Sequence, residues 1–102
     1  MAPSAGSLRA ALIQTCASDV PAQNLAATST LIREAAERGA QFALTPEVTN
    51  MVTFSRSLQA EVLKPEEADE SLAGYRALAA ELGIWILVGS LALKAPPEAA
   101  FP

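Results

Sequence analysis

The stretch Phe-Ala-Leu-Thr-Pro-Glu at residues 42–47 decides how the rest of the chain is interpreted. A short apolar run ends at Pro46, which has no N–H group to offer a sheet, and Glu47 follows at once. The pattern predicts a buried strand that presents Glu47 at its carboxyl end. In open α/β sheets, ligands and catalytic groups collect at that edge. A solvated or helix-capping glutamate is the competing interpretation, and the rest of the chain decides between the two.

Two further strands are predicted, one on each side of this stretch. Residues 8–16 are mostly apolar, and residues 84–93 carry the strongest β signal in the chain. The central strand is expected over residues 41–45. None of the three alternates strictly between apolar and polar positions, which is typical of strands buried on both faces of a parallel sheet.

Helical spacing fills the gaps between the strands. Asp19 is predicted to cap the first helix, a proline stands in its first turn, and Gly39 supplies the left-handed residue that ends it. The second helix is predicted to begin at residues 64–67, where a proline precedes two acids, and to end at Gly83.

The predicted order is therefore β-α-β-α-β, an α/β fold with parallel strands joined by crossover helices. If the strands are added in one direction, both helices cover the same face, and the other apolar face needs a second sheet, a domain or a partner. We expect a flexible arm at residues 1–7, the first part of a larger domain at residues 8–93, and a turn or tail at residues 94–102, where the domain is cut short.

Length and composition allow one small domain and argue against several classes of function. The chain has 102 residues, of which 51% are hydrophobic and 18% are charged, so it has enough apolar surface to fold. A net charge of −4 argues against binding to nucleic acid, and the longest apolar run is too short to cross a membrane. The single cysteine fits a reducing cytoplasm. The absence of histidine removes histidine-based catalysis and zinc motifs, and no metal or cofactor is expected.

For the other candidate residues, the sequence favours a structural role in the core or on the surface over a role in a site. Met51 and Phe54, which follow Glu47, either line a substrate pocket or fill the core, and the core is favoured for apolar residues. Cys16 has no base or cation beside it in sequence and is expected as a small core residue. Lys64 and Lys94 are expected as exposed charges. Glycine-rich phosphate loops are absent, which discourages a mononucleotide-binding protein.

Several pieces of the chain resemble the carbon–nitrogen hydrolase (nitrilase) superfamily, in order and with its spacing. They are a first strand (residues 8–14), the opening and the end of a long helix (residues 23–25 and 32–40), the strand-Pro-Glu motif (residues 44–47) and a third strand (residues 83–90). The similarity covers residues 8–93. It implies the start of a four-layer α-β-β-α sandwich.

The resemblance also implies a Glu-Lys-Cys site that hydrolyses nonpeptide C–N bonds in a small amide, nitrile or carbamoyl substrate. The glutamate of the Pro-Glu motif, the general base toward the cysteine, falls on Glu47. The family's lysine and cysteine lie on later strands: Lys94 comes too early and Cys16 is on the wrong strand. The chain alone is therefore expected to be inactive, and the resemblance permits a homo-oligomer. A non-catalytic interaction module that pairs its bare sheet face with a partner stays open as the alternative.

Overall fold

The computed structural model describes residues 6–96, so the predictions for residues 1–5 and 97–102 lie outside it. Its centre is a parallel three-stranded sheet of β1 (Ala10–Leu12), β2 (Phe42–Leu44) and β3 (Trp85–Leu87), in that order. Each strand is shorter than predicted, because the chain leaves the ladder one to six residues before the apolar runs end. The α/β class with parallel strands is confirmed.

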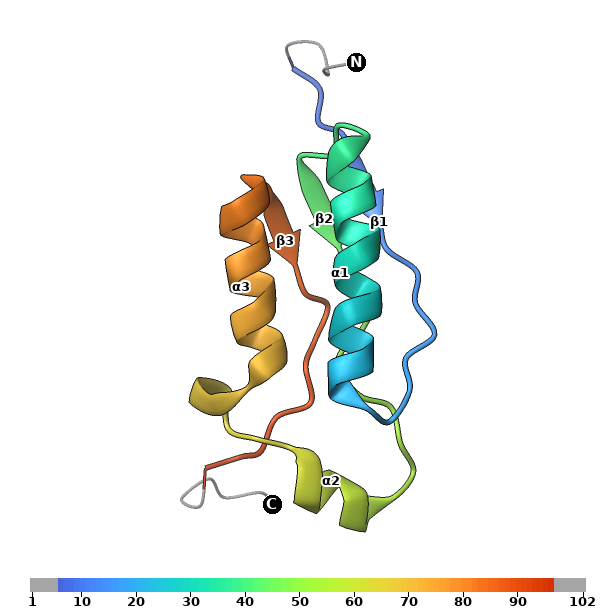
Figure 1. Ribbon diagram of the computed structural model, residues 1–102, viewed down its shortest axis with the longest axis vertical. Helices are drawn as coiled ribbons and strands as arrows, with labels where there is room; N and C mark the ends of the chain where they lie inside the picture. The colour runs from blue at the N-terminus through green and yellow to red at the C-terminus, as the bar shows by residue number, and fades with distance from the viewer. Residues whose placement is uncertain (1–5, 97–102) are drawn as a thin grey trace.

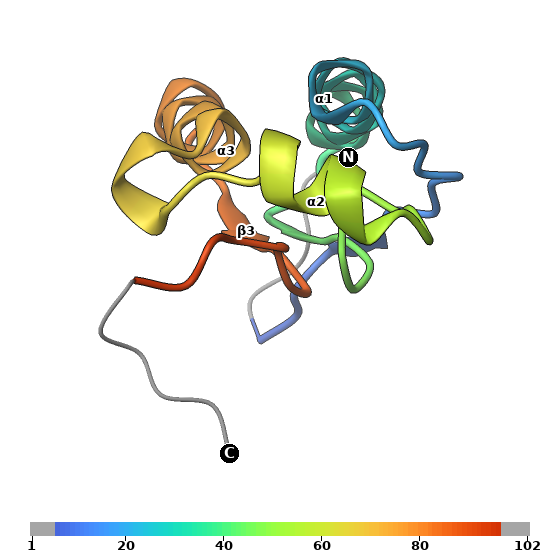
Figure 2. The ribbon, with the colours of Figure 1, turned by 90° about the horizontal axis from the view of Figure 1, so that it is seen from below.

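Two long helices, α1 (Pro21–Glu37) and α3 (Glu70–Leu82), pack side by side on one face of the sheet (Figures 1 and 2). This confirms that the strands are added in one direction. Between β2 and α3 the chain forms the short helix α2 (Arg56–Val62) and the single 3₁₀ turn η1 (Glu66–Ala68), which lie beyond the carboxyl ends of the strands.

Local signals explain most of the helix ends. The backbone of Val20, the residue before Pro21, is extended, as expected for a residue that precedes proline, so α1 begins at Pro21 and Val20 is its N-cap. The prediction that Asp19 caps α1 is wrong, because Asp19 stands one residue too early to do so. Both glycine stops are confirmed, with φ of +90° at Gly39 and +65° at Gly83.

The helix after η1 starts later than the sequence predicts. The proline and acids at residues 64–67 lead into η1, and α3 itself begins after Asp69, whose carboxylate accepts a hydrogen bond of 2.8 Å from the Leu72 amide. The helix α2 is missed altogether. It has an N-cap, Ser55, but none of its residues is buried, so it carries no apolar stripe that a sequence pattern could reveal.

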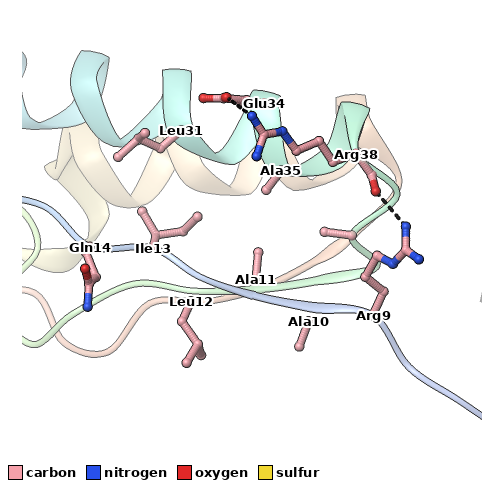
Figure 3. Close-up of a pocket in the computed structure, with 11 residues that line it drawn as sticks. Arg9, Ala10, Ala11, Leu12, Ile13, Gln14, Leu31, Glu34, Ala35 and Arg38 are labelled. Atoms are coloured by element: carbon pink, nitrogen blue, oxygen red, sulfur yellow. Dashed lines mark hydrogen bonds and ion pairs between the residues drawn. The ribbon is translucent and has the colours of Figure 1, made fainter.

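The register of the sheet separates a covered face from a bare one. Ala11, Ala43 and Ile86 lie in one row under the helices. The neighbouring row, which includes Leu12 and Leu87, points the other way and is 75% and 53% exposed at those two residues. Figure 3 shows the alternation along β1, where Leu12 points away from α1. The prediction of a second, uncovered face is confirmed for the described chain, because nothing in residues 6–96 covers that face.

The core lies between the sheet and the two long helices. Its buried members are Ile13, Ile32, Ala43, Tyr75 and Leu78. Burial raises the pKa of the Tyr75 phenol. At the outer rim, Arg33 of α1 forms a two-pronged ion pair with Glu81 of α3, and this pairing lowers the pKa of Glu81. Both side chains are exposed, so solvent weakens the pair and the apolar core carries the packing.

We predict that Ile32→Ala lowers the free energy of unfolding by about 2–5 kcal/mol, the range for truncation of a buried aliphatic side chain. Ile32 is fully buried at the centre of the cluster, whereas the adjacent Leu31 is 36% exposed. Leu31→Ala on the same helix turn is therefore the control and should cost less than half as much. Urea unfolding followed by circular dichroism measures both. Equal losses would contradict the placement of the core.

Candidate active site at the carboxyl edge of the sheet

The strand β2 delivers Glu47 to the carboxyl edge of the sheet, as the sequence predicts. The ladder continues one step past β2, where the Thr45 amide donates to the Leu87 carbonyl at 3.0 Å. The chain then passes Pro46 and turns at Glu47, whose side chain is exposed. No segment within residues 6–96 covers this side chain, which fits the competing interpretation of a solvated glutamate for the described chain.

Two threonine hydroxyls close the turn at residues 46–49, called here the Glu47 turn. The Thr49 hydroxyl donates to the Pro46 carbonyl, and it lies 2.8 Å from the Thr45 hydroxyl. Because the one hydroxyl hydrogen of Thr49 goes to Pro46, the Thr45 hydroxyl is the donor between the two threonines. Both side chains are buried, so the hydroxyls have no water to exchange with and the turn is held from inside.

The segment after β3 holds the same turn from the outside. The Val48 amide donates to the Ser90 hydroxyl at 2.7 Å, and the Thr49 amide donates to the Ser90 carbonyl at 3.0 Å. This contact needs a glycine at position 89. A Cβ built on Gly89 would lie 2.6 Å from the backbone carbonyl group of Pro46 and from the carbonyl oxygen of Thr45, and backbone atoms in two hydrogen-bonded segments cannot give way.

Within the Glu47 turn, Val48 has an unusual backbone. Its φ is +49°, in the left-handed region that a β-branched residue rarely adopts. Such a conformation costs on the order of 1–3 kcal/mol and persists where surrounding contacts fix it. Here those contacts are the hydrogen bonds to Ser90. Among non-glycine residues in the described chain, Val48 alone has positive φ.

Two buried asparagines tie the three carboxyl-edge loops together. The Asn24 amide group donates to the carbonyls of Ser18 and Asn50, each at 2.8 Å, and its oxygen accepts from the Ser18 amide at 2.9 Å. Asn50 in turn pairs with the backbone of Ala92, with bonds of 2.9 and 2.8 Å. The segments after β1, β2 and β3 are thus joined through side chains that are at most 6% exposed.

The structure places the other predicted residues at different depths. Met51 is 2% exposed and fills the core beside the turn, while Phe54 is fully exposed. The prediction of Cys16 as a core residue is wrong: β1 ends at Leu12, and the thiol lies on the exposed connection to α1. Lys64 and Lys94 are exposed, as expected.

The residues that hold Glu47 in place are not predicted from the sequence. Thr49 and Asn50 come five and six residues after the end of β2, and Ser90 comes three residues after the end of β3. Asn24 falls on the buried side of α1. The buried face of α1 carries two polar residues, Asn24 and Thr28. Because buried polar side chains need hydrogen-bond partners, these two residues are the sequence signal for a polar network at this edge of the sheet.

A pocket of about 360 Å³ lies away from this edge, between β1 and α1 (Figure 3). Ala11, Ile13 and Leu31 line it, and at its rim the Arg9 guanidinium donates to the Arg38 carbonyl at 2.9 Å. Glu34 and Arg38 form an exposed ion pair at this rim, and no residue of the Glu47 turn lines the pocket. Its position marks the unpaired edge of β1 and not a reaction site.

Two further classes of site find no support in residues 6–96. No group of three histidine, cysteine, aspartate or glutamate side chains in that range is arranged to hold a metal ion. Of the helices that the structure describes, none combines the length and the apolar character needed to cross a membrane.

The geometry defines an α/β domain with one helix-covered sheet face and a carboxylate held on a fixed turn at the carboxyl edge. Residues 9–99 match the family model of the carbon–nitrogen hydrolases, which covers most of the chain. The chain belongs to the carbon–nitrogen hydrolase family. No curated protein sequence matches it.

We predict that Asn24→Asp destabilises the fold by about 2–3 kcal/mol at pH 7, since an acceptor oxygen would face two carbonyls where the amide now donates. These carbonyls disfavour the ionised form, so they raise the folded-state pKa of the new acid. The penalty is full above that pKa and decreases as the pH falls through it, because the protonated acid donates one bond.

The measurement is the urea midpoint between pH 4 and pH 8, relative to the parent chain. Gln23→Glu is the control, because it makes the same amide-to-acid change at an exposed neighbour in the first turn of α1. It should cost nothing at neutral pH. A pH-independent penalty at Asn24 would contradict the assigned hydrogen bonds.

Proposed function

We propose that the chain is the N-terminal part of an enzyme that hydrolyses nonpeptide carbon–nitrogen bonds and that Glu47 is its general base. The observation that carries the proposal is the Pro-Glu turn at the carboxyl end of β2, in a chain that belongs to the carbon–nitrogen hydrolase family. The substrate is a small amide, nitrile or carbamoyl compound. The enzyme is proposed to act in the cytoplasm.

In the proposed reaction, Glu47 accepts the proton of a cysteine thiol, and the thiolate attacks the carbon of the substrate C–N group. For an amide, the C–N bond breaks and ammonia or an amine leaves, protonated by the acid form of Glu47. Water, activated by the same carboxylate, then hydrolyses the thioester. The cysteine, and a lysine that stabilises the tetrahedral intermediate, are proposed to lie on a part of the protein that follows residue 102.

The bare sheet face supports a larger domain. Leu12, Trp85 and Leu87 are 75%, 76% and 53% exposed, and a parallel sheet is normally covered on both faces. We propose that a second sheet packs on this face, to complete an α-β-β-α sandwich. The same closure would bring further strands and their loops over the exposed Glu47 turn, so that one packing event would both bury the apolar face and enclose the base.

We predict that Glu47→Gln lowers the rate of ammonia release from amide or nitrile substrates by a factor on the order of 10²–10⁴ in the natural protein purified from its source. Glutamine keeps the size of the side chain and loses the proton acceptor. Glu61→Gln, on an exposed position of α2, is the matched control and should leave the rate unchanged.

The 102-residue chain alone should release no ammonia, because members of a catalytic constellation act as a unit. If the isolated chain hydrolyses the substrate and Glu47→Gln abolishes this activity, the proposed lysine and cysteine are not needed. Full activity of the Glu47→Gln natural protein would exclude Glu47 as the base.

The bare face also favours a second candidate, a non-catalytic module that pairs this face with a partner or a copy of itself. If so, sedimentation velocity of the 102-residue chain should show a stable complex, and Leu87→Glu should return it to monomer without loss of helix content, since Leu87 lies on the bare face and is 53% exposed. Glu67→Leu, on the exposed η1 turn, is a control at an unrelated position. A folded monomer at all concentrations would exclude pairing with a copy of itself.

A further inference from the structure

We propose that Ser90 is a positioning residue for Glu47, which makes the end of β3 a part of the site. The proposal rests on the proposed function for its catalytic meaning, but its structural content is independent of that function. Ser90 sits 43 positions after Glu47 in sequence, and it contacts the Glu47 turn through both its side chain and its backbone.

The direction of a side chain is fixed when both peptide groups that flank its Cα are fixed. On one side of Glu47, the carbonyl of Pro46 accepts from the Thr49 hydroxyl. On the other side, the amide of Val48 donates to the Ser90 hydroxyl at 2.7 Å. These two bonds together restrain φ and ψ of Glu47, and therefore the direction of the Cα–Cβ bond from which its side chain extends.

The two bonds differ in what removal would do. Thr49 is buried, so removal of its hydroxyl would leave the Pro46 carbonyl without a partner inside the turn. Ser90 is exposed, and water could replace its hydroxyl as the acceptor for the Val48 amide. An exposed serine adds little to global stability, so its bond to the turn acts mainly on local conformation.

The left-handed backbone of Val48 indicates that this conformation is imposed. A valine left to itself avoids φ of +49°. Ser90 holds both amides that follow Glu47, because its hydroxyl accepts from Val48 and its carbonyl accepts from Thr49. Without the hydroxyl, the Val48 peptide is free to rotate toward negative φ, and the Glu47 side chain would be redirected with it.

The neighbouring glycine makes the arrangement specific to this pair of segments. Gly89 lets the chain after β3 pass so close to Thr45 and Pro46 that a Cβ at position 89 would lie 2.6 Å from their backbone atoms. The Gly89 amide donates to the Thr45 carbonyl at 3.2 Å. That approach brings the Ser90 hydroxyl within reach of the turn. Gly89 and Ser90 thus act together: Gly89 allows the close approach because it has no side chain, and Ser90 bonds the turn through its hydroxyl.

The test is NMR spectroscopy of the full 102-residue chain with Ser90→Ala, Ser90→Thr and, as a matched control, Thr30→Ala. Thr30 also bonds a backbone group through its hydroxyl, at an exposed position of α1. Two readouts are taken at Val48: the intraresidue NOE between the amide and α protons, which is strong at positive φ, and the amide exchange rate.

In Ser90→Ala we expect the Val48 NOE to weaken and the amide to exchange about tenfold faster, the change that loss of one hydrogen bond produces. Ser90→Thr, which keeps the hydroxyl, should restore both readouts, and Thr30→Ala should change neither. The melting temperature should stay within a few degrees of the parent in all three variants, because the altered side chains are exposed. Unchanged NOE and exchange in Ser90→Ala would overturn the proposal.

A second arm uses the natural protein and its amide-hydrolysis assay. We expect Ser90→Ala to lower kcat about tenfold with KM unchanged, and Ser90→Thr to restore it, since a misdirected base affects the reaction and not substrate binding. An unchanged kcat would overturn the positioning role. A parent protein without hydrolytic activity would overturn the proposed function instead, and the NMR arm would still decide whether Ser90 holds the turn.

Discussion

The close backbone contact between Gly89 and the Thr45–Pro46 peptide is the constraint on which the candidate site depends. It extends the pairing of β2 and β3 beyond the last residues of the regular ladder, where parallel strands would otherwise diverge into separate loops. Three consequences follow. The Thr45 and Thr49 hydroxyls are enclosed, Ser90 reaches the Glu47 turn, and Asn50 is brought to the backbone of Ala92. The fixed turn therefore results from the approach of two segments more than 40 residues apart in sequence.

The helices cover only one face of the sheet, and this leaves an apolar face exposed in the described chain. Because the strands are added in one direction with right-handed crossovers, α1 and α3 must occupy the same face. The row that contains Leu12, Leu44 and Leu87 then has no cover within residues 6–96. An apolar face beside an exposed carboxylate is a poor arrangement for a finished enzyme, since a general base works best in a site from which water is excluded. The same arrangement is reasonable for half of a sandwich whose second half closes over both.

Sequence reasoning recovered the features that depend on local signals. Proline at the start of α1, glycine at the two helix ends and the apolar runs of the strands each act over a few residues, and each appears where expected. It failed where the outcome depends on distant segments. The bonds from Asn24 to Asn50 and from Val48 to Ser90 could not be predicted, since the bonded residues lie 26 and 42 residues apart in sequence. Whether Met51 or Phe54 meets a substrate stays a prediction.

The most direct test of the central claim is the intact mass of the natural gene product, measured by mass spectrometry on protein from its source cells. We expect a mass well above 10.6 kDa, with a sequence that continues past residue 102 into strands that carry a lysine and then a cysteine. Glu47 would then be one member of a complete site. A natural product of 10.6 kDa would contradict the proposed role of Glu47, because the cell would make the base without the nucleophile that the base is proposed to serve.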